Sequence, residues 1–336
     1  MESDRTIRRY QSSTGVTVYK LPVEAFPSHF TNCYLVLDDC VTLIDAASGW
    51  ADANEHLRAR FDELQASFGE KIRLRDIKRL LITHGHIDHF GGVNFLLKES
   101  QATLGIHELD VSVLQNFKER LILSTKNLHL YLDRTGFSAE RVKSLLEMNK
   151  WSKDWFQATP VNLTLREGPL DGSSFYVHHV PGHCPGEVCL QLHDLLFTGD
   201  HVLHRTTPNQ SPEFITRYTG LGHYLDSLKK IGAVAGVRVG LGGHERDIAD
   251  VPARAEAIRQ FHEERLARAL EICRAPKSLA DVSRELFGKQ SGYHVLLAIL
   301  ETGAHVEYLY ERGHLVVANM DKVEQEYNPV LLYQAR

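Results

Sequence analysis

One short stretch constrains the fold of this chain more than any other, because it concentrates potential metal ligands directly after an apolar run. The run Leu80–Ile82 is typical of a buried strand. Directly after it come four candidate ligands within six residues, which are His84, His86, Asp88 and His89. Imidazole and carboxylate groups held at the end of a rigid strand suit a divalent metal, with zinc favoured over iron or manganese. The stretch therefore predicts a metal site at a strand end.

Three more candidate ligands follow strand-like segments at positions beside glycine. His183 follows the segment 175–180 and Pro181-Gly182, Asp200 follows the second strand of a hairpin over 188–200, and His244 follows 237–243. Glycine allows the sharp turn that brings such a side chain close to a metal. Together with the first cluster these make five histidines and two aspartates. Seven ligands are too many for one tetrahedral ion and fit two ions that share a ligand, so the sequence predicts a binuclear site.

The order and local context of these motifs resemble the metallo-β-lactamase superfamily over about residues 15–250. Asp45, at the end of Thr42-Leu43-Ile44-Asp45, fits the early aspartate of that superfamily. The resemblance implies that Asp200 bridges two metals and that Asp45 orients the ligands without binding a metal, the alternative being an aspartate that only caps a loop. It also implies one metal held by His84, His86 and His183 and a second held by Asp88, His89 and His244.

The same resemblance implies an α/β fold, a four-layer αββα metallo-β-lactamase sandwich over residues 1–250. Alternating strands and helices agree with this, but they are equally compatible with a Rossmann-type α/β fold. Residues 108–160 interrupt the pattern as a helical insert, with apolar residues spaced for one helix face and aromatic residues at its end. The insert is either a lid over the substrate or a packed helical segment. The apolar positions are Leu109, Val113, Leu114, Phe117 and Leu121, and the aromatic ones are Trp151, Trp155 and Phe156.

Residues 251–336 change in composition and predict a separate helical domain. Helices are expected over 252–273, from Lys277-Ser278 to about 288, and over 293–312, followed by a strand at 315–317. Three helices and a strand resemble a winged-helix-like module. This region holds 11 Lys+Arg and 12 Asp+Glu, a net charge of −1. Phosphate binding needs the opposite sign, so we expect packing or homo-oligomerisation here and no nucleic-acid partner.

The composition of the 336 residues is that of a soluble globular protein, with 43% hydrophobic and 24% charged residues. No apolar run is long enough to span a membrane, and the N-terminus lacks the apolar core of a secretory signal. The five cysteines form no Cys-x-x-Cys pair, which favours free thiols in a reducing compartment. We therefore expect a cytoplasmic protein with a small-molecule substrate, no membrane partner and, at a net charge of −5, no attraction to nucleic acid.

The predicted chemistry is hydrolysis by a hydroxide that bridges two divalent metals, assisted by Asp88, Asp200 and Asp45. Cys184, next to His183, is expected to be a small buried side chain and no nucleophile. The closest group in the resemblance is hydroxyacylglutathione-hydrolase-like with a winged C-terminal module, which implies a thioester or lactone substrate. Glu187 stands where that group often has a histidine.

Two other functions remain open for this chain. Some relatives with similar C-terminal modules cut single-stranded RNA, and others are persulfide dioxygenases. A dioxygenase would use a single iron at His84, His183 and Asp200. Metal analysis separates one iron from two zinc ions, and a salt-sensitive cleavage assay tests the RNA alternative.

Overall fold

The computed structural model describes residues 5–149 and 155–336, and these form two compact units. Unit 1 comprises Met1–Phe117, Trp155–Pro208 and Ser227–Ala255. Unit 2 comprises Lys118–Asp154, Asn209–Asp226 and Glu256–Arg336. The helical segment predicted as an insert thus groups with the C-terminal helices, and the units do not follow the predicted boundary at residue 250. The two-domain division and the lid therefore stay predictions, and Trp151 lies outside the described residues.

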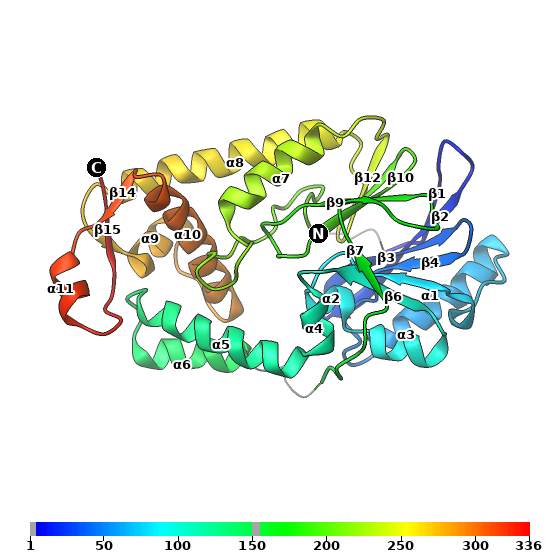
Figure 1. The fold of residues 1–336 in the computed structure, drawn as a ribbon, viewed down its shortest axis with the longest axis horizontal. Coiled ribbons are helices and arrows are strands. Elements are labelled where there is room, and N and C mark those ends of the chain that lie inside the picture. Colours follow the sequence, from blue (N-terminus) through cyan, green and yellow to red (C-terminus); the bar gives the residue numbers. More distant parts are fainter. Residues whose placement is uncertain (1–4, 150–154) are drawn as a thin grey trace. The chain divides into compact units, whose positions relative to one another are not determined.

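The first sheet of unit 1 has seven strands in the order β1-β2-β3-β4-β5-β6-β7 (Figure 1). Strands β1 to β4 are joined as antiparallel neighbours, and β4 to β7 pair in parallel. The strands are β1 (Arg8–Gln11), β2 (Thr17–Phe26), β3 (His29–Leu37), β4 (Val41–Ile44), β5 (Arg79–Leu81), β6 (Thr103–His107) and β7 (Leu163–Leu165). Parallel strands need long crossovers, and helices supply them here.

The second sheet of unit 1 has five strands in the order β12-β11-β10-β9-β8. Only the β11–β12 pair is parallel. The strands are β8 (Gly168–Pro169), β9 (Phe175–His179), β10 (Val188–Leu192), β11 (Leu195–Gly199) and β12 (Val239–Gly242). The hairpin predicted over 188–200 is the β10–β11 pair, with His193 in the left-handed conformation at its turn.

One apolar core joins the two sheets. Val36 and Ile44 from the first sheet belong to the same buried cluster as Leu190 and Phe197 from the second. Each of these side chains is at most 1% exposed. At about 25 cal/mol per Å² of buried apolar surface, such a core is the main stabilising contribution to unit 1. The sheets are therefore packed face to face, and their strand ends carry the candidate ligands.

Short helices connect the strands of the first sheet, as the sequence predicted. The first of them, α1, buries Leu57, Phe61 and Leu64, packs against β2 and has Gly69 as its C-cap. These helices are α1 (Ala53–Phe68), the 3-10 turn η1 (Leu74–Asp76), α2 (Ile87–Phe90), α3 (Val93–Glu99) and α4 (Val111–Gln115). Two further helices, α7 (Leu221–Gly232) and α8 (Val251–Ile272), contain residues of both units.

The prediction of one continuous helix face from Leu109 to Leu121 is wrong. Leu109 precedes α4, and Asn116 separates α4 from α5. Asn116 has φ −129° and ψ 37°, which ends the helical hydrogen bonding. The segment Lys118–Asn149 is nevertheless helical as predicted, with α5 (Phe117–Asp133) and α6 (Ala139–Asn149).

The C-terminal part of unit 2 contains the three predicted helices and a small antiparallel sheet in the order β13-β15-β14. Ser278 caps α9 by accepting a hydrogen bond from the Asp281 backbone N–H. The elements are β13 (Lys277–Ser278), α9 (Leu279–Phe287), α10 (Tyr293–Glu311), β14 (Leu315–Val317), α11 (Met320–Gln325) and β15 (Leu332–Ala335). Assignment of this region as a winged-helix-like module remains a prediction.

The acidic residues of α10 are used inside unit 2. Glu301 pairs with Arg265, and its second oxygen accepts the Gln210 backbone N–H. Glu307 accepts the backbone N–H groups of Glu213 and Phe214. These two carboxylates thus bind neighbouring backbone, and α10 itself contains no Lys or Arg.

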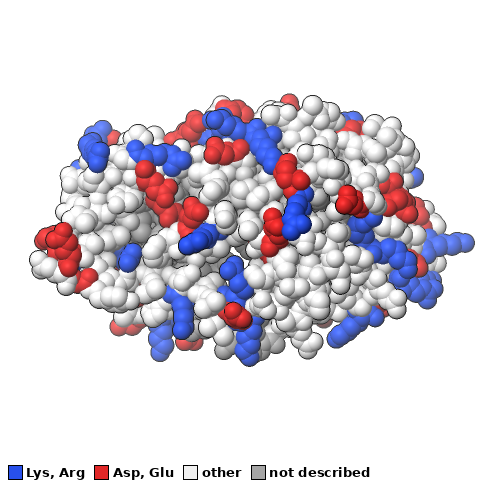
Figure 2. All heavy atoms as spheres, in the orientation of Figure 1, with Lys and Arg blue, Asp and Glu red and all other residues white. Residues whose placement is uncertain are grey.

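Positive and negative side chains are interspersed on the face of the molecule drawn in Figure 2, without a broad region of one sign. Among the described residues, no helix combines the length and the apolar character needed to cross a membrane.

Candidate metal centre

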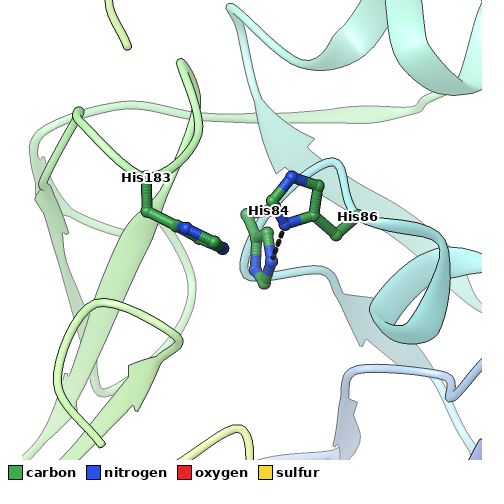
Figure 3. Close-up of side chains that lie close together, drawn as sticks. All are labelled: His84, His86 and His183. Atoms are coloured by element: carbon green, nitrogen blue, oxygen red, sulfur yellow. Dashed lines mark hydrogen bonds between the residues drawn. The ribbon is translucent and has the colours of Figure 1, made fainter. Parts of the chain in front are cut away.

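Three histidines predicted to share one metal come together at the ends of two strands. His84 and His86 lie in the turn between β5 and α2, and His183 lies in the loop between β9 and β10 (Figure 3). His84 Nε2 and His86 Nδ1 are 3.1 Å apart. The ring centroids of His86 and His183 are 4.5 Å apart. Their ligand atoms lie within 4.8 Å of one another, so one ion can contact all three.

The second predicted ligand group also converges, next to Asp200. Asp88 and His89 lie on α2, and His244 follows β12. His244 Nε2 lies 3.4 Å from His89 Nε2 and 3.5 Å from Asp88 Oδ2. His89 Nε2 lies 3.8 Å from the same Asp88 oxygen. The arrangement gathers two imidazole nitrogens and one carboxylate oxygen.

Asp200 lies between the two groups. Its Oδ1 is 3.4 Å from His89 Nε2, and its Oδ2 is 3.2 Å from His244 Nε2. The same Oδ2 is 3.9 Å from His183 Nε2. A carboxylate in this position can contact ions on both sides, which is the bridging role that the resemblance implied.

The backbone around Asp200 requires glycine. Gly243 has no side chain, and a Cβ placed there would come within 2.5 Å of Asp200 Oδ1 and 2.6 Å of His89 Cε1. Gly243 also donates its N–H to the Gly199 carbonyl, which ties the end of β12 to the end of β11. The glycines that the sequence placed before the ligands therefore allow two strand ends to approach each other.

Asp45 fixes the orientation of two of the histidines. Its Oδ2 is 2.8 Å from His89 Nδ1, and its Oδ1 accepts the Thr83 backbone N–H at 2.8 Å. The Thr83 hydroxyl donates to Asp45 at 3.0 Å, which leaves its oxygen to accept from His84 Nδ1 at 3.0 Å. Because Nδ1 of both rings is engaged in these hydrogen bonds, the Nε2 atoms of His84 and His89 face the site.

The ring of His244 is oriented in the same way. Its Nδ1 donates to the Phe30 carbonyl at 2.7 Å, and its Nε2 therefore faces the site. Asp45 itself is buried and holds φ at +61°, a left-handed conformation that aspartate tolerates better than most residues. The geometry therefore makes Asp45 a positioning residue in this structure, and its effect on metal binding remains a proposal.

Two buried carboxylates near the site were not predicted to support it. Asp110, after β6, accepts the backbone N–H of Gly85 at 2.8 Å and of Gly186 at 3.1 Å. Cys184 is buried and its thiol donates to Asp110 at 3.3 Å, so it is held as a small buried side chain. Asp110 thereby joins the loop that carries His84 and His86 to the loop that carries His183. The sequence did contain a signal for Asp110. It follows the parallel strand β6, just as the predicted ligands follow their strands.

Glu187 is the second of these carboxylates and is fully buried. Its Oε1 accepts the Asp200 backbone N–H at 2.8 Å and lies 3.7 Å from His84 Nδ1. The sequence marked Glu187 only as a departure from the related group. In the structure it occupies the space behind Asp200 and fixes the backbone there.

His29 is a third residue that the sequence did not single out. It begins β3, and its Nε2 lies 3.0 Å from Asp88 Oδ2. Its ring centroid is 4.6 Å from that of His244. Nothing in its sequence context distinguishes it from a surface histidine at a hairpin turn.

The charges within the site are strongly coupled. Burial raises the pKa of Asp88 and of Asp200, but neighbouring histidines outweigh it and hold both pKa values well below the usual range. Burial lowers the pKa of His84 well below its usual value and that of His86 to about 3, and nearby histidines add to the effect. At neutral pH the carboxylates are therefore ionised and these two imidazoles are neutral, the forms in which both groups bind metals.

The donor set fits a pair of divalent cations. Zinc–nitrogen bonds of about 2.0–2.1 Å in a tetrahedral site place two ligand nitrogens about 3.3 Å apart. The His84–His86 and His89–His244 nitrogen separations of 3.1 and 3.4 Å agree with that spacing. Asp200 Oδ1 is buried and accepts no hydrogen bond from the described residues, so an oxygen is left for a cation. Metal occupancy itself remains a proposal.

Comparison with known proteins identifies what this arrangement is similar to. A family model described as the metallo-beta-lactamase superfamily matches residues 27–244, which include all seven predicted ligands and Asp45. Hydroxyacylglutathione hydrolase GloC of Haemophilus influenzae is 28% identical over 186 residues, covering 54% of this chain and 69% of the relative. Atrochrysone carboxyl ACP thioesterase of Aspergillus fumigatus is 25% identical over 247 residues, covering 72% of this chain and 60% of the relative.

Similarity to solved structures extends over nearly the whole chain. A metallo-beta-lactamase family protein from Thermus thermophilus superposes with a TM-score of 0.75 at 28% identity, covering 95% of this chain and 98% of that one. A beta-lactamase domain protein from Burkholderia ambifaria gives a TM-score of 0.75 at 22% identity, with coverages of 98% and 93%, and supports the fold alone.

Proposed function

Because the chain belongs to the metallo-β-lactamase superfamily, we propose that it is a metal-dependent hydrolase of a small thioester or lactone. The predicted α/β fold of this superfamily is confirmed. The observation that carries the proposal is that each of the two predicted ligand groups converges and that Asp200 lies within 4 Å of histidines of both groups. Two divalent ions bound there, with zinc expected, would lower the pKa of a shared water and polarise the attacked carbonyl.

Each residue of the site has a defined task in this proposal. His84, His86 and His183 would hold one ion, and Asp88, His89 and His244 would hold the other. Asp200 would be a ligand common to both. Asp45 and Thr83 keep the Nδ1 protons of His84 and His89 directed away from the ions. No side-chain nucleophile is required, and Cys184 is unsuited to that role because burial raises the pKa of its thiol well above the usual value.

A thioester is favoured as the substrate class by the relatives. One is named a hydroxyacylglutathione hydrolase and another an ACP thioesterase, and they match 54% and 72% of this chain. Their identities of 28% and 25% support a shared reaction type more than a shared substrate. A lactone presents the same carbonyl chemistry and remains within the proposal.

Metal analysis combined with a substrate panel tests this function. We expect about two divalent ions per chain and turnover of thioesters or lactones that is lost after chelation and restored by Zn²⁺. The variant Asp200→Ala should lose both metal and turnover, whereas Asp62→Ala, on the exposed face of α1, should keep both. An Asp200→Ala protein with unchanged metal content and activity would refute the proposal.

The same measurement decides between the alternatives. One iron per chain without hydrolysis would favour the mononuclear dioxygenase, and salt-sensitive cleavage of single-stranded RNA would favour the endonuclease. The acidic composition of residues 251–336 counts against the endonuclease.

A further inference from the structure

We infer that His29 is a positioning residue for the second metal site, acting through Asp88. The inference rests on the proposed function, which makes Asp88 a ligand of that site. His29 lies outside the ligand motifs of the sequence, and it begins β3, whereas Asp88 lies on α2. The hairpin of β2 and β3 brings the two side chains together.

The contact itself is a direct one. His29 Nε2 lies 3.0 Å from Asp88 Oδ2, the same oxygen that is 3.5 Å from His244 Nε2 and 3.8 Å from His89 Nε2. A hydrogen bond from an imidazole N–H to a carboxylate restricts the carboxylate to one rotamer. His29 therefore holds the one carboxylate of this ligand group in the orientation that faces the two histidines.

The position of the His29 ring is fixed by the hairpin. A two-residue turn, Pro27-Ser28, joins β2 to β3 and pairs Phe26 with His29. Ser28 adopts φ +65°, and its N–H donates to Glu24 Oε1 at 2.8 Å. The rings of Phe26 and His29 stack with centroids 6.2 Å apart. The turn and the stacking hold the imidazole over Asp88, although its side chain is 48% exposed.

Asp88 has a greater need for such a partner than Asp200. Asp200 is held through its own backbone, because its N–H donates to Glu187 and the Gly199 carbonyl accepts from Gly243. Asp88 lies on the four-residue helix α2, and His29 supplies its shortest side-chain contact among the described residues. Partners of this kind typically account for about 10–100-fold in metal affinity.

Two substitutions separate the hydrogen bond from the ring. His29→Phe keeps the aromatic contact with Phe26 and removes the donor. His29→Gln keeps a hydrogen-bond donor, because the glutamine amide N–H lies near the position of Nε2. The amide group itself is a poor metal ligand. The matched control is His56→Phe on the exposed side of α1. Each metal-free variant and the wild type would be titrated with Zn²⁺ in the presence of a competing chelator, so that two binding steps are measured separately.

We expect His29→Phe to weaken one Zn²⁺ step about 10–100-fold and to leave the other unchanged, with His29→Gln close to wild type. The unchanged step, at His84, His86 and His183, shows that the variant is folded. If both Zn²⁺ steps of His29→Phe had the same affinity as in the wild type, the inference would be overturned. A His29→Gln protein as impaired as His29→Phe would also overturn it, since His29 would then act as a ligand itself. A wild type that binds fewer than two ions would instead overturn the proposed function, whatever the variants do.

Discussion

The carboxylate of Asp45 accepts a hydrogen bond from His89 Nδ1 at 2.8 Å, across 44 residues of sequence. Both side chains are essentially inaccessible to water. The contact determines which nitrogen of His89 carries the proton, and thus which nitrogen faces Asp88 and Asp200. We therefore expect Asp45, without being a ligand itself, to influence how well His89 binds a metal.

Replacing Asp45 by asparagine should therefore weaken the second metal site. The amide can turn its NH₂ group toward His89 Nδ1 and favour the wrong tautomer. We expect a loss of about 10–100-fold in Zn²⁺ affinity at that site. A chelator-competition titration measures it, with Asp62→Asn as the exposed control. Unchanged affinity in Asp45→Asn would mean that Asp45 serves only the loop it belongs to.

Asp110 should contribute to stability and to the first metal site together. Its substitution by alanine leaves the buried N–H groups of Gly85 and Gly186 without their acceptor. Each such group costs about 1–3 kcal/mol, so we expect the free energy of unfolding to fall by about 2–6 kcal/mol. Urea unfolding measures the loss, and Zn²⁺ titration should show that the site of His84 and His183 weakens more than the other. A stability within about 0.5 kcal/mol of the wild type, as expected for an exposed substitution, would contradict this role.

Glu187 should be replaceable by glutamine but not by alanine. Glutamine keeps an oxygen that accepts the Asp200 N–H, whereas alanine leaves that N–H unpaired and opens a cavity in a fully buried position. We expect Glu187→Ala to lower the free energy of unfolding by about 2–5 kcal/mol and Glu187→Gln to stay within about 1.5 kcal/mol of the wild type. Denaturant unfolding of both proteins provides the comparison. Equal stabilities of the two variants would show that the hydrogen bond to Asp200 contributes nothing.

A pair of buried histidines in unit 2 should make stability depend on pH. His305 Nδ1 donates to the Glu301 carbonyl at 2.7 Å, so its Nε2 accepts from His262 Nδ1 at 3.0 Å. Burial lowers the pKa of His262 to about 2 and that of His305 to about 3. The unfolded chain takes up these protons below a pKa of about 6.5, but the folded chain does not. Stability is therefore lost as the pH falls from about 6.5 toward 3, by about 1.4 kcal/mol per pH unit for each histidine.

His262→Gln removes one of these titrating groups and tests the linkage. The variant should be less stable than the wild type at pH 7, because a buried hydrogen bond is changed. As the pH falls from about 6 to about 4, the difference in the free energy of unfolding between the two proteins should narrow by about 1.4 kcal/mol per pH unit. Urea unfolding across this range gives the two curves, with His56→Gln as the exposed control. Parallel curves for the wild type and His262→Gln would exclude His262 as a source of the pH dependence.

Local patterns were enough to locate most of the elements and the ligand-bearing strand ends. The apolar runs before His84 and Asp200 correspond to β5 and β11, and the helix expected over 293–312 corresponds to α10. The prediction of one helix face from Leu109 to Leu121 was wrong. The spacing of apolar residues does not reveal a single non-helical residue such as Asn116. Short strands such as β8 and β13 carry too few residues for any periodic signal.

By itself, the sequence determined the candidate ligands and the fold class, because ligand spacing and strand patterns are local and are written into consecutive residues. Only the tertiary structure decided which residues support those ligands. Asp110 and Glu187 meet the site across 25 and 13 residues, and His29 reaches Asp88 across 59. Such contacts depend on how hairpins and sheet edges are brought together, and the free energy for that comes from the shared apolar core and not from the polar residues concerned.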